Sequence, residues 1–182
     1  MSLTLKQQTM LATWQQHTLA EFGLKDADAA LATMTENPYV LCVASGRGGV
    51  GRAGVREFYA HQFLTSIPRD FELESLSQSF SDDRIVEELV ARFTHTLDMG
   101  WMLPDVPPTQ RKVEVALVGL IQFQADKIAR EHLYWDQATV LSQLGVVSHQ
   151  AAAAGVGSAA RLRKLSAHAA SEESFSVSVT AA

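Results

Sequence analysis

The chain has 182 residues, which is enough for one domain with a substantial core and too few to expect two. Its apolar fraction of 47% and its charged fraction of 19% are typical of a soluble globular protein. A formal net charge of -5 argues against a protein that binds nucleic acid by electrostatics, because such a protein needs a clustered basic face. No run of residues reaches the ~20 apolar positions of a membrane-spanning helix.

Two features of the sequence predict a cytoplasmic location. Cys42 is the single cysteine, so it cannot form an intramolecular disulfide, and this favours a reducing compartment. Its place in the apolar run 39–44 indicates a buried small hydrophobic side chain rather than a nucleophile. At the N-terminus, Lys6, Gln7 and Gln8 stand where the apolar core of a secretory signal would lie.

The N-terminal part of the chain shows the residue spacing of amphipathic helices. Residues 3–22 form the first predicted helix, whose apolar stripe contains Leu11, Trp14, Thr18 and Phe22. A second helix fits residues 27–34 and stops before Asn37-Pro38. A short strand at 39–44 and a glycine-rich turn then lead to a third helix at 52–64.

From Pro68 onward the apolar residues alternate as they do in β-strands. The predicted strands cover residues 71–80, 84–99, 112–123 and 127–136, and a short helix follows at 138–144. The tight connection at 124–127 joins antiparallel neighbours. Helices followed by long antiparallel strands indicate an α+β fold rather than a parallel doubly wound sheet.

The composition changes after Val147 and predicts a domain boundary there. Residues 148–182 are rich in alanine and serine, with few large apolar side chains to offset the entropy of ordering. We therefore expect one domain over residues 1–147 and a C-terminal tail over 148–182 that is partly helical or mobile.

A glycine motif, Gly46-Arg47-Gly48-Gly49-Val50-Gly51, matches the dinucleotide-binding pattern G-x-G-x-x-G. A Rossmann unit would continue with alternating strands and helices, whereas this chain continues with antiparallel strands. The interpretation as a flexible turn is therefore preferred, and no nicotinamide cofactor is expected.

The histidines do not predict a metal site. None of the six falls in the local spacing of a zinc site. A pair of His95 and His132 with Asp136 would imitate a facial triad, but one sequence cannot establish it. We expect neither a metal nor an organic cofactor.

The segment Glu131–Gln137 is the strongest candidate for a functional site, because polar and aromatic side chains crowd the end of an apolar strand. Side chains alternate along a strand, so His132, Tyr134 and Asp136 share one face and Glu131, Leu133 and Trp135 share the other. A partly desolvated Asp136 would suit general acid/base chemistry. The residue pattern alone favours its alternative role as the N-cap of the following helix.

Two further features leave alternatives open. His95, in the middle of a predicted strand, is either functional or a core histidine satisfied by a neighbouring hydroxyl. The apolar, proline-rich stretch 101–108 is either a lid over a cavity or a subunit contact, because it is too hydrophobic for an ordinary solvated turn.

Four segments together carry a family resemblance: the helix at 51–59, the run Phe93-Thr94-His95-Thr96 with Gly100, the loop at 107–113, and the ending 127–136 followed by Gln143-Leu144-Gly145. In their order and spacing they resemble the SnoaL-like polyketide cyclase branch of the nuclear transport factor 2-like superfamily. The resemblance covers roughly residues 10–147.

The resemblance implies a cone-shaped α+β barrel, in which a bent antiparallel sheet wraps around three N-terminal helices and an apolar pocket opens at the wide end. It also implies a homodimer formed through the outer face of the sheet. Asp136 matches the aspartate that serves the cyclases of the family as general acid/base. Their partner histidine lies in the strand at 112–123, where this chain has none, so the candidates here are His95 and His132.

The leading hypothesis is thus a cofactor-independent enzyme, similar to a cyclase or isomerase, that transfers a proton on an apolar carbonyl compound. Asp136 would be the base, His95 or His132 its proton partner, and Tyr134 a donor to the developing enolate. The apolar walls would be Trp14, Tyr59, Trp101 and Trp135. The alternatives are a non-catalytic dimeric ligand-binding module and a hydrolase with a water activated by Asp136.

Overall fold

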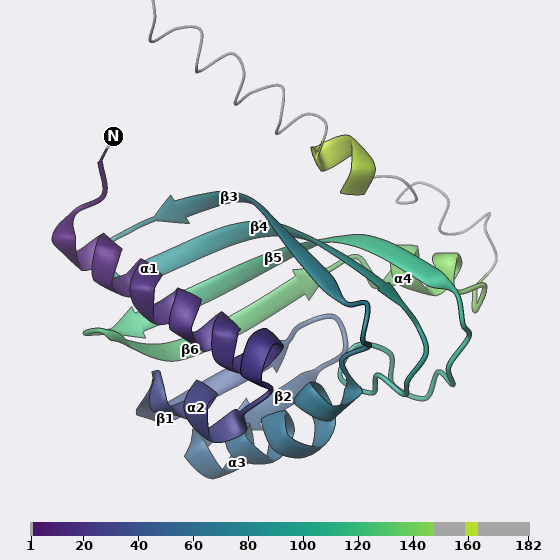
Figure 1. Ribbon diagram of the computed structural model, residues 1–182, viewed down its shortest axis with the longest axis horizontal. Coiled ribbons are helices and arrows are strands. Elements are labelled where there is room, and N and C mark those ends of the chain that lie inside the picture. The colour runs from purple at the N-terminus through teal and green to yellow at the C-terminus, as the bar shows by residue number, and fades with distance from the viewer. Residues whose placement is uncertain (1, 148–158, 164–182) are drawn as a thin grey trace, which may run out of the picture.

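The structure is a computed structural model that describes residues 2–147 and 159–163. The fold is α+β: N-terminal helices pack on one face of a curved, mixed sheet of six strands (Figure 1). The strand order is β2-β1-β6-β5-β4-β3. The predicted fold class is confirmed.

The helices and strands follow the predicted order closely. The helices are α1 (Leu5–Thr18), α2 (Ala27–Ala32), α3 (Gly51–Phe58) and α4 (Gln137–Gln143). The strands are β1 (Met34–Cys42), β2 (Arg47–Val50), β3 (Glu72–Phe80), β4 (Arg84–Thr94), β5 (Lys112–Gln124) and β6 (Lys127–Trp135). No helix among the described residues is long and apolar enough to cross a membrane.

Helix α1 begins at a capping box and ends in a wider turn. The Thr4 hydroxyl accepts from the Gln7 amide while the Gln7 side chain accepts from the Thr4 amide, which satisfies two free donors at the helix start. A π-helical turn, Leu19–Leu24, continues the helix to Lys25, whose φ of 53° ends it. This wider turn carries Glu21 into the interior, where it is 2% exposed.

The buried stripe of α1 differs from the predicted one. It contains Met10, Trp14 and His17, whereas Leu11 and Thr18 are only partly buried. The prediction was wrong because the true core face carries a histidine, and a search for apolar spacing passes over it.

Strand β1 also departs from the prediction, since it starts at Met34 and runs through Asn37-Pro38. Proline cannot donate a ladder hydrogen bond, and here it lies within a shift of register between Met34 and Tyr39. Beyond this shift β1 runs parallel to β6, so the sheet is mixed, while β3 to β6 form the expected antiparallel meander.

The expected turn is confined to residues 43–46, and most of the glycine motif forms a strand. Residues 47–50 pair with β1 as β2. A Cβ atom on Gly48 would lie 2.0 Å from the Val40 carbonyl oxygen, and one on Gly49 would lie 2.3 Å from the Gly54 carbonyl oxygen. These glycines therefore allow close packing of β2 against β1 and α3, and no phosphate site is needed to explain them.

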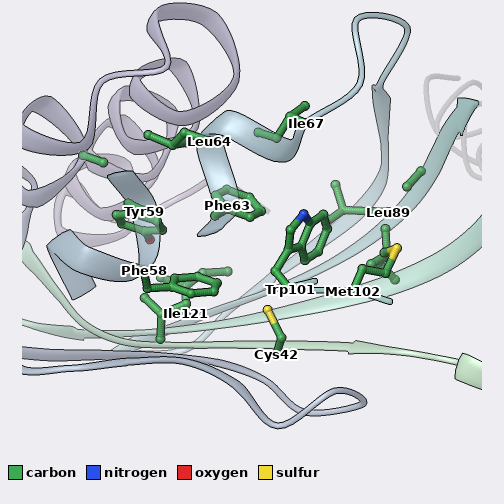
Figure 2. Close-up of a cluster of buried hydrophobic side chains, with 14 of the residues drawn as sticks. Cys42, Phe58, Tyr59, Phe63, Leu64, Ile67, Leu89, Trp101, Met102 and Ile121 are labelled. Carbon is green, nitrogen blue, oxygen red and sulfur yellow. The ribbon is translucent and has the colours of Figure 1, made fainter. Parts of the chain in front are cut away.

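The core lies between the helices and the concave face of the sheet. Figure 2 shows part of it, where Phe58, Phe63 and Trp101 meet side chains of the sheet such as Leu89 and Ile121. Met99 and the run Trp101 to Leu103 are at most 2% exposed, so the apolar stretch after β4 packs into this core.

The described part of the C-terminal tail is short. Residues 159–163 are helical, and Arg163 forms ion pairs with Glu74 and Glu114 of the sheet, with N–O distances of 2.6 and 3.3 Å. The predictions for residues 148–158 and 164–182 lie outside the described residues.

Candidate active site

A cavity of about 880 Å³ lies between the helices and the concave face of the sheet. Its walls are largely aromatic and aliphatic, and five aromatic residues line it: Trp14, Phe22, Phe63, Phe71 and Trp101. Three carboxylates, Glu21, Glu87 and Glu131, also line it, and no lysine or arginine among the described residues does. An apolar cavity with a few convergent polar groups is the usual form of a small-molecule site.

The polar centre of the cavity is a buried cluster of His17, Glu21 and Glu131. The imidazole Nε2 of His17 lies 3.3 Å from a Glu21 carboxylate oxygen and 3.5 Å from one of Glu131. Glu21 comes from the turn after α1, and Glu131 comes from β6. The two carboxylates line the cavity, and His17 lies behind them.

Neighbouring groups fix the orientation of His17. Its Nδ1 is 2.7 Å from the Thr33 hydroxyl oxygen and 3.2 Å from the Ala30 carbonyl oxygen. The Trp14 indole stacks on the imidazole, with ring centroids 5.6 Å apart. The ring therefore presents Nε2 to the two carboxylates.

The electrostatics of the cluster favour a protonated imidazole. Burial alone would lower the pKa of His17, but the charges and hydrogen bonds of Glu21 and Glu131 outweigh it and raise the pKa to about 10. Burial raises the pKa of Glu21, although His17 partly opposes this. Glu21, whose pKa is raised, therefore lies close to the His17 imidazolium and to the carboxylate of Glu131.

Tyr59 completes the cluster from the helical side. Its hydroxyl lies 3.2 Å from a Glu131 carboxylate oxygen, to which it donates, and 3.1 Å from His17 Nε2. Burial raises the pKa of Tyr59 well above its usual range, so the phenol stays a hydrogen-bond donor at neutral pH.

A second polar subsite surrounds Glu87 of β4. The carboxylate is 5% exposed and accepts hydrogen bonds from Trp14 Nε1 at 2.7 Å, Gln78 at 2.8 Å and Ser75. These neutral donors compensate the Glu87 carboxylate for the water it loses on burial. The same Trp14 indole stacks on His17, so it contacts both polar subsites.

The cluster also has the donor types of a metal site. One ligand atom each from His17, Glu21 and Glu131 lies within 4.8 Å of the others. Among the described residues this is the group that offers such an arrangement. Imidazole and carboxylate donors suit divalent transition metals.

The structure does not bring the predicted catalytic face into the cavity. Glu131 and Leu133 line the cavity, whereas His132 and Tyr134 lie on the outer face of β6. The prediction that His132, Tyr134 and Asp136 form the lining is therefore wrong. His132 Nε2 lies 2.9 Å from the Tyr39 hydroxyl, and Tyr134 is 42% exposed.

Asp136 is the N-cap of α4. One carboxylate oxygen accepts from the amides of Ala138 and Thr139, and the other accepts from the Thr139 hydroxyl at 2.6 Å. The Thr139 hydroxyl and these amides hold the pKa of Asp136 below its usual range. The contacts of Asp136 are thus those of the capping role, and it does not line the cavity.

His95 is buried apart from the cavity. Its Nδ1 accepts from the Thr109 amide at 3.3 Å and lies 3.3 Å from the Thr109 hydroxyl. Burial lowers the pKa of His95, which keeps the imidazole neutral at neutral pH. These contacts match its interpretation as a core histidine.

The four residues expected in the apolar walls have different positions. Trp14 and Trp101 line the cavity. Tyr59 lies behind it, in the polar cluster, and Trp135 packs edge to face on Trp101 with ring centroids 6.0 Å apart.

Sequence reasoning missed His17, Glu21 and Glu87, and it named Glu131 only on the face of the strand that it did not prefer. A signal existed for the first two: they follow Trp14 at offsets of three and seven residues, which places them on the side of α1 that faces the core. Two ionisable residues on a buried stripe need a partner, and this requirement could have marked them. No comparable local signal marked Glu87.

Comparisons with known proteins agree with this architecture. The family described as SnoaL-like polyketide cyclase matches residues 7–144. The fold is similar to that of a SnoaL-like polyketide cyclase from Jannaschia sp. CCS1, with a TM-score of 0.65 at 15% identity over 81% of this chain and 99% of that chain. A search of curated proteins found no match.

Two other solved structures share the fold. One is SalBIII, an epoxide hydrolase/cyclase-like enzyme in pyran ring formation in the polyether salinomycin, with a TM-score of 0.55 and 20% identity over 72% of this chain and 94% of that one. The other is TerC co-crystallised with polyporic acid, with a TM-score of 0.56 and 14% identity over 75% of this chain and 98% of that one.

Proposed function

Because the chain belongs to the SnoaL-like polyketide cyclase family, we propose that it is an enzyme that transfers a proton on a neutral, apolar carbonyl compound bound in the cavity. Glu21 and Glu131 are the proposed acid/base pair. The observation that carries this proposal is that both carboxylates line the cavity and share the Nε2 atom of His17.

The environments of the two carboxylates suit different roles. Glu21 has a raised pKa and is placed to donate a proton. Glu131 accepts from Tyr59 and faces the imidazolium of His17, so it is placed to remove one. A carboxyl with a raised pKa suits the acid of such a pair.

The charge of the cavity narrows the class of substrate. Three carboxyl groups line it without a lysine or arginine among the described residues, and the His17 imidazolium behind them offsets the charge of only one, so an anionic substrate would find no cationic partner in the lining. The resemblance to SalBIII and TerC supports small-molecule chemistry in the cavity.

Exchange of α-hydrogens tests the proposal without the natural substrate. In D₂O, the protein is expected to accelerate deuteration of an apolar ketone such as β-tetralone, followed by proton NMR. Replacement of Glu131 by Gln is expected to slow this exchange by roughly 10²- to 10⁴-fold, because an amide cannot serve as the base.

Asp136→Asn is the matched control, since asparagine also caps helices well. It is expected to leave the exchange rate unchanged. A normal rate in Glu131→Gln, or a loss confined to Asp136→Asn, would contradict the assignment. Ketone binding without exchange in the wild type would instead favour a non-catalytic ligand-binding module.

A metal-assisted reaction is the second candidate, and the donor set of His17, Glu21 and Glu131 favours it. His17 is oriented through Nδ1 by Thr33 and the Ala30 carbonyl, as histidine ligands often are. If this candidate holds, Zn²⁺ raises the melting temperature and a chelator abolishes the exchange. If Glu21 and Glu131 act without a metal, a chelator leaves the exchange rate unchanged.

We also propose a homodimer formed through the outer face of β5 and β6, where Val118 and Tyr134 are exposed. Light scattering is expected to give twice the chain mass of 19.8 kDa. Tyr134→Glu is expected to give the single mass, whereas Leu5→Glu, at an exposed position of α1, is expected to keep the dimer. A monomeric wild type would contradict this proposal.

The cytoplasmic location stays a prediction.

A further inference from the structure

We infer that the indole N–H of Trp101 binds a hydrogen-bond-accepting oxygen of the ligand. The proposed binding class is a neutral, largely apolar molecule with a carbonyl, ether or hydroxyl oxygen. The inference rests on the proposed function only in taking the cavity as the ligand site, and it does not require proton transfer.

Trp101 is a buried donor without an acceptor. Its side chain lines the cavity and is 2% exposed, and Nε1 has no hydrogen-bond partner among the described residues. Figure 2 shows Trp101 between Phe63 and Leu89, which also line the cavity, with the indole nitrogen at the upper edge of the ring. A buried N–H left unsatisfied is costly, so such a group in a binding cavity points to an acceptor on the ligand.

Several other side-chain donors of the cavity lining are already used. Trp14, Ser75 and Gln78 all donate to Glu87. The hydroxyls of Thr18 and Ser77 donate to the Gln15 carbonyl and to Glu88. Among the buried lining residues that the structure describes, Trp101 thus has a free N–H donor, separate from the carboxyl proton that the proposed function assigns to Glu21.

The backbone around Trp101 is held firmly, so the indole cannot easily turn toward another acceptor. The Ser45 hydroxyl donates to the Trp101 carbonyl at 2.6 Å, and the Gln137 side chain donates to the Met102 carbonyl at 3.0 Å. The Leu103 amide closes the turn on the Met99 carbonyl at 2.7 Å.

The aromatic neighbours do not replace an oxygen acceptor. Phe63 contacts Trp101 edge to face, with ring centroids 4.9 Å apart. An N–H contact to an aromatic face is weaker than an N–H···O hydrogen bond. A ligand oxygen therefore gains affinity at this position, while the carboxylates of the cavity disfavour a ligand that carries negative charge.

A matched pair of ligands tests the inference by calorimetry. β-Tetralone and tetralin have nearly the same shape, but only the ketone carries an acceptor. The wild type is expected to bind β-tetralone about 2- to 10-fold more tightly, the range for one neutral hydrogen bond. Trp101→Phe keeps an aromatic wall and is expected to bind the two ligands equally.

The indole N–H signals give a second readout. The chain has three tryptophans, and Trp14 and Trp135 donate to Glu87 and Gln137. In ¹H–¹⁵N spectra, β-tetralone is expected to shift the Trp101 signal downfield relative to tetralin, while the Trp135 signal serves as the internal control. Each signal is assigned from its Trp→Phe variant.

The inference is overturned if neither ligand binds, if both bind the wild type equally, or if Trp101→Phe keeps the preference for the ketone. Different measurements test this inference and the proposed function, so the failure of one can be told from the failure of the other. Loss of α-hydrogen exchange in Glu131→Gln tests the acid/base pair, whereas the ketone preference is expected to persist in that variant.

Discussion

Replacement of His17 by alanine is expected to lower the free energy of unfolding by about 3–5 kcal/mol near neutral pH, because it removes the shared partner of two buried carboxylates. Glu21 and Glu131 lie 3.3 and 3.5 Å from the imidazole, and all three side chains are at most 3% exposed. Urea denaturation measures the loss. The loss is expected to shrink as the pH falls, because protonation removes the charge of the unpaired carboxyls.

His61→Ala is the control for this variant. His61 and Glu57 also form a pair four residues apart, with a distance of 3.7 Å, but their side chains are 63% and 67% exposed. An exposed pair contributes little, so this variant is expected to stay within about 0.5 kcal/mol of the wild type. A loss in His17→Ala that is independent of pH would point to a packing defect and contradict the electrostatic account.

The stability of the wild type is expected to fall from neutral to alkaline pH. The pKa of His17 is about 10 in the folded protein and about 6.5 without these contacts. A raised pKa contributes stability that is fully present below pH 6.5 and is lost as the pH rises through about 10. The raised pKa of Glu21 also makes stability fall with rising pH, but this loss begins above its ordinary value of 4.5.

The size of this effect is roughly 5 kcal/mol at most, from the difference between 6.5 and about 10. Urea denaturation across this window, compared with His17→Gln, isolates the contribution of the imidazole. The variant is expected to show a flatter dependence on pH. Equal slopes for the two proteins would mean that folding does not raise the pKa of His17, and ¹⁵N NMR of the imidazole would measure that pKa directly.

The fold was predictable because it rests on periodic burial. In β4 and β5, residues with low and high exposure alternate, and the sequence carries this pattern as alternating apolar positions. The start of β1 was missed because Pro38 usually ends a regular element, and only the shift of register makes room for it.

The candidate site was less predictable, because its residues are distant in the sequence. His17 meets Glu131 only after the sheet has formed. The choice of face on β6 was equally open, since a carboxylate and an aromatic occur on both faces. The pairing of β6 with β1 and β5 decides which face turns toward the cavity. It places His132 beside Tyr39 on the outer side.

The parallel pairing of β1 with β6 has a consequence for the order of folding. Tyr39 pairs with Arg130, which is 91 positions later (130 minus 39), whereas β3 to β6 pair with near neighbours in the chain. Closing so long a loop is entropically costly, so we expect this contact to form after the meander. His17 and Glu21 meet Glu131 in the same late step. His17 and Glu131 can thus keep their hydration until each meets its partner of opposite charge, and the chain avoids an intermediate in which a lone charge is buried.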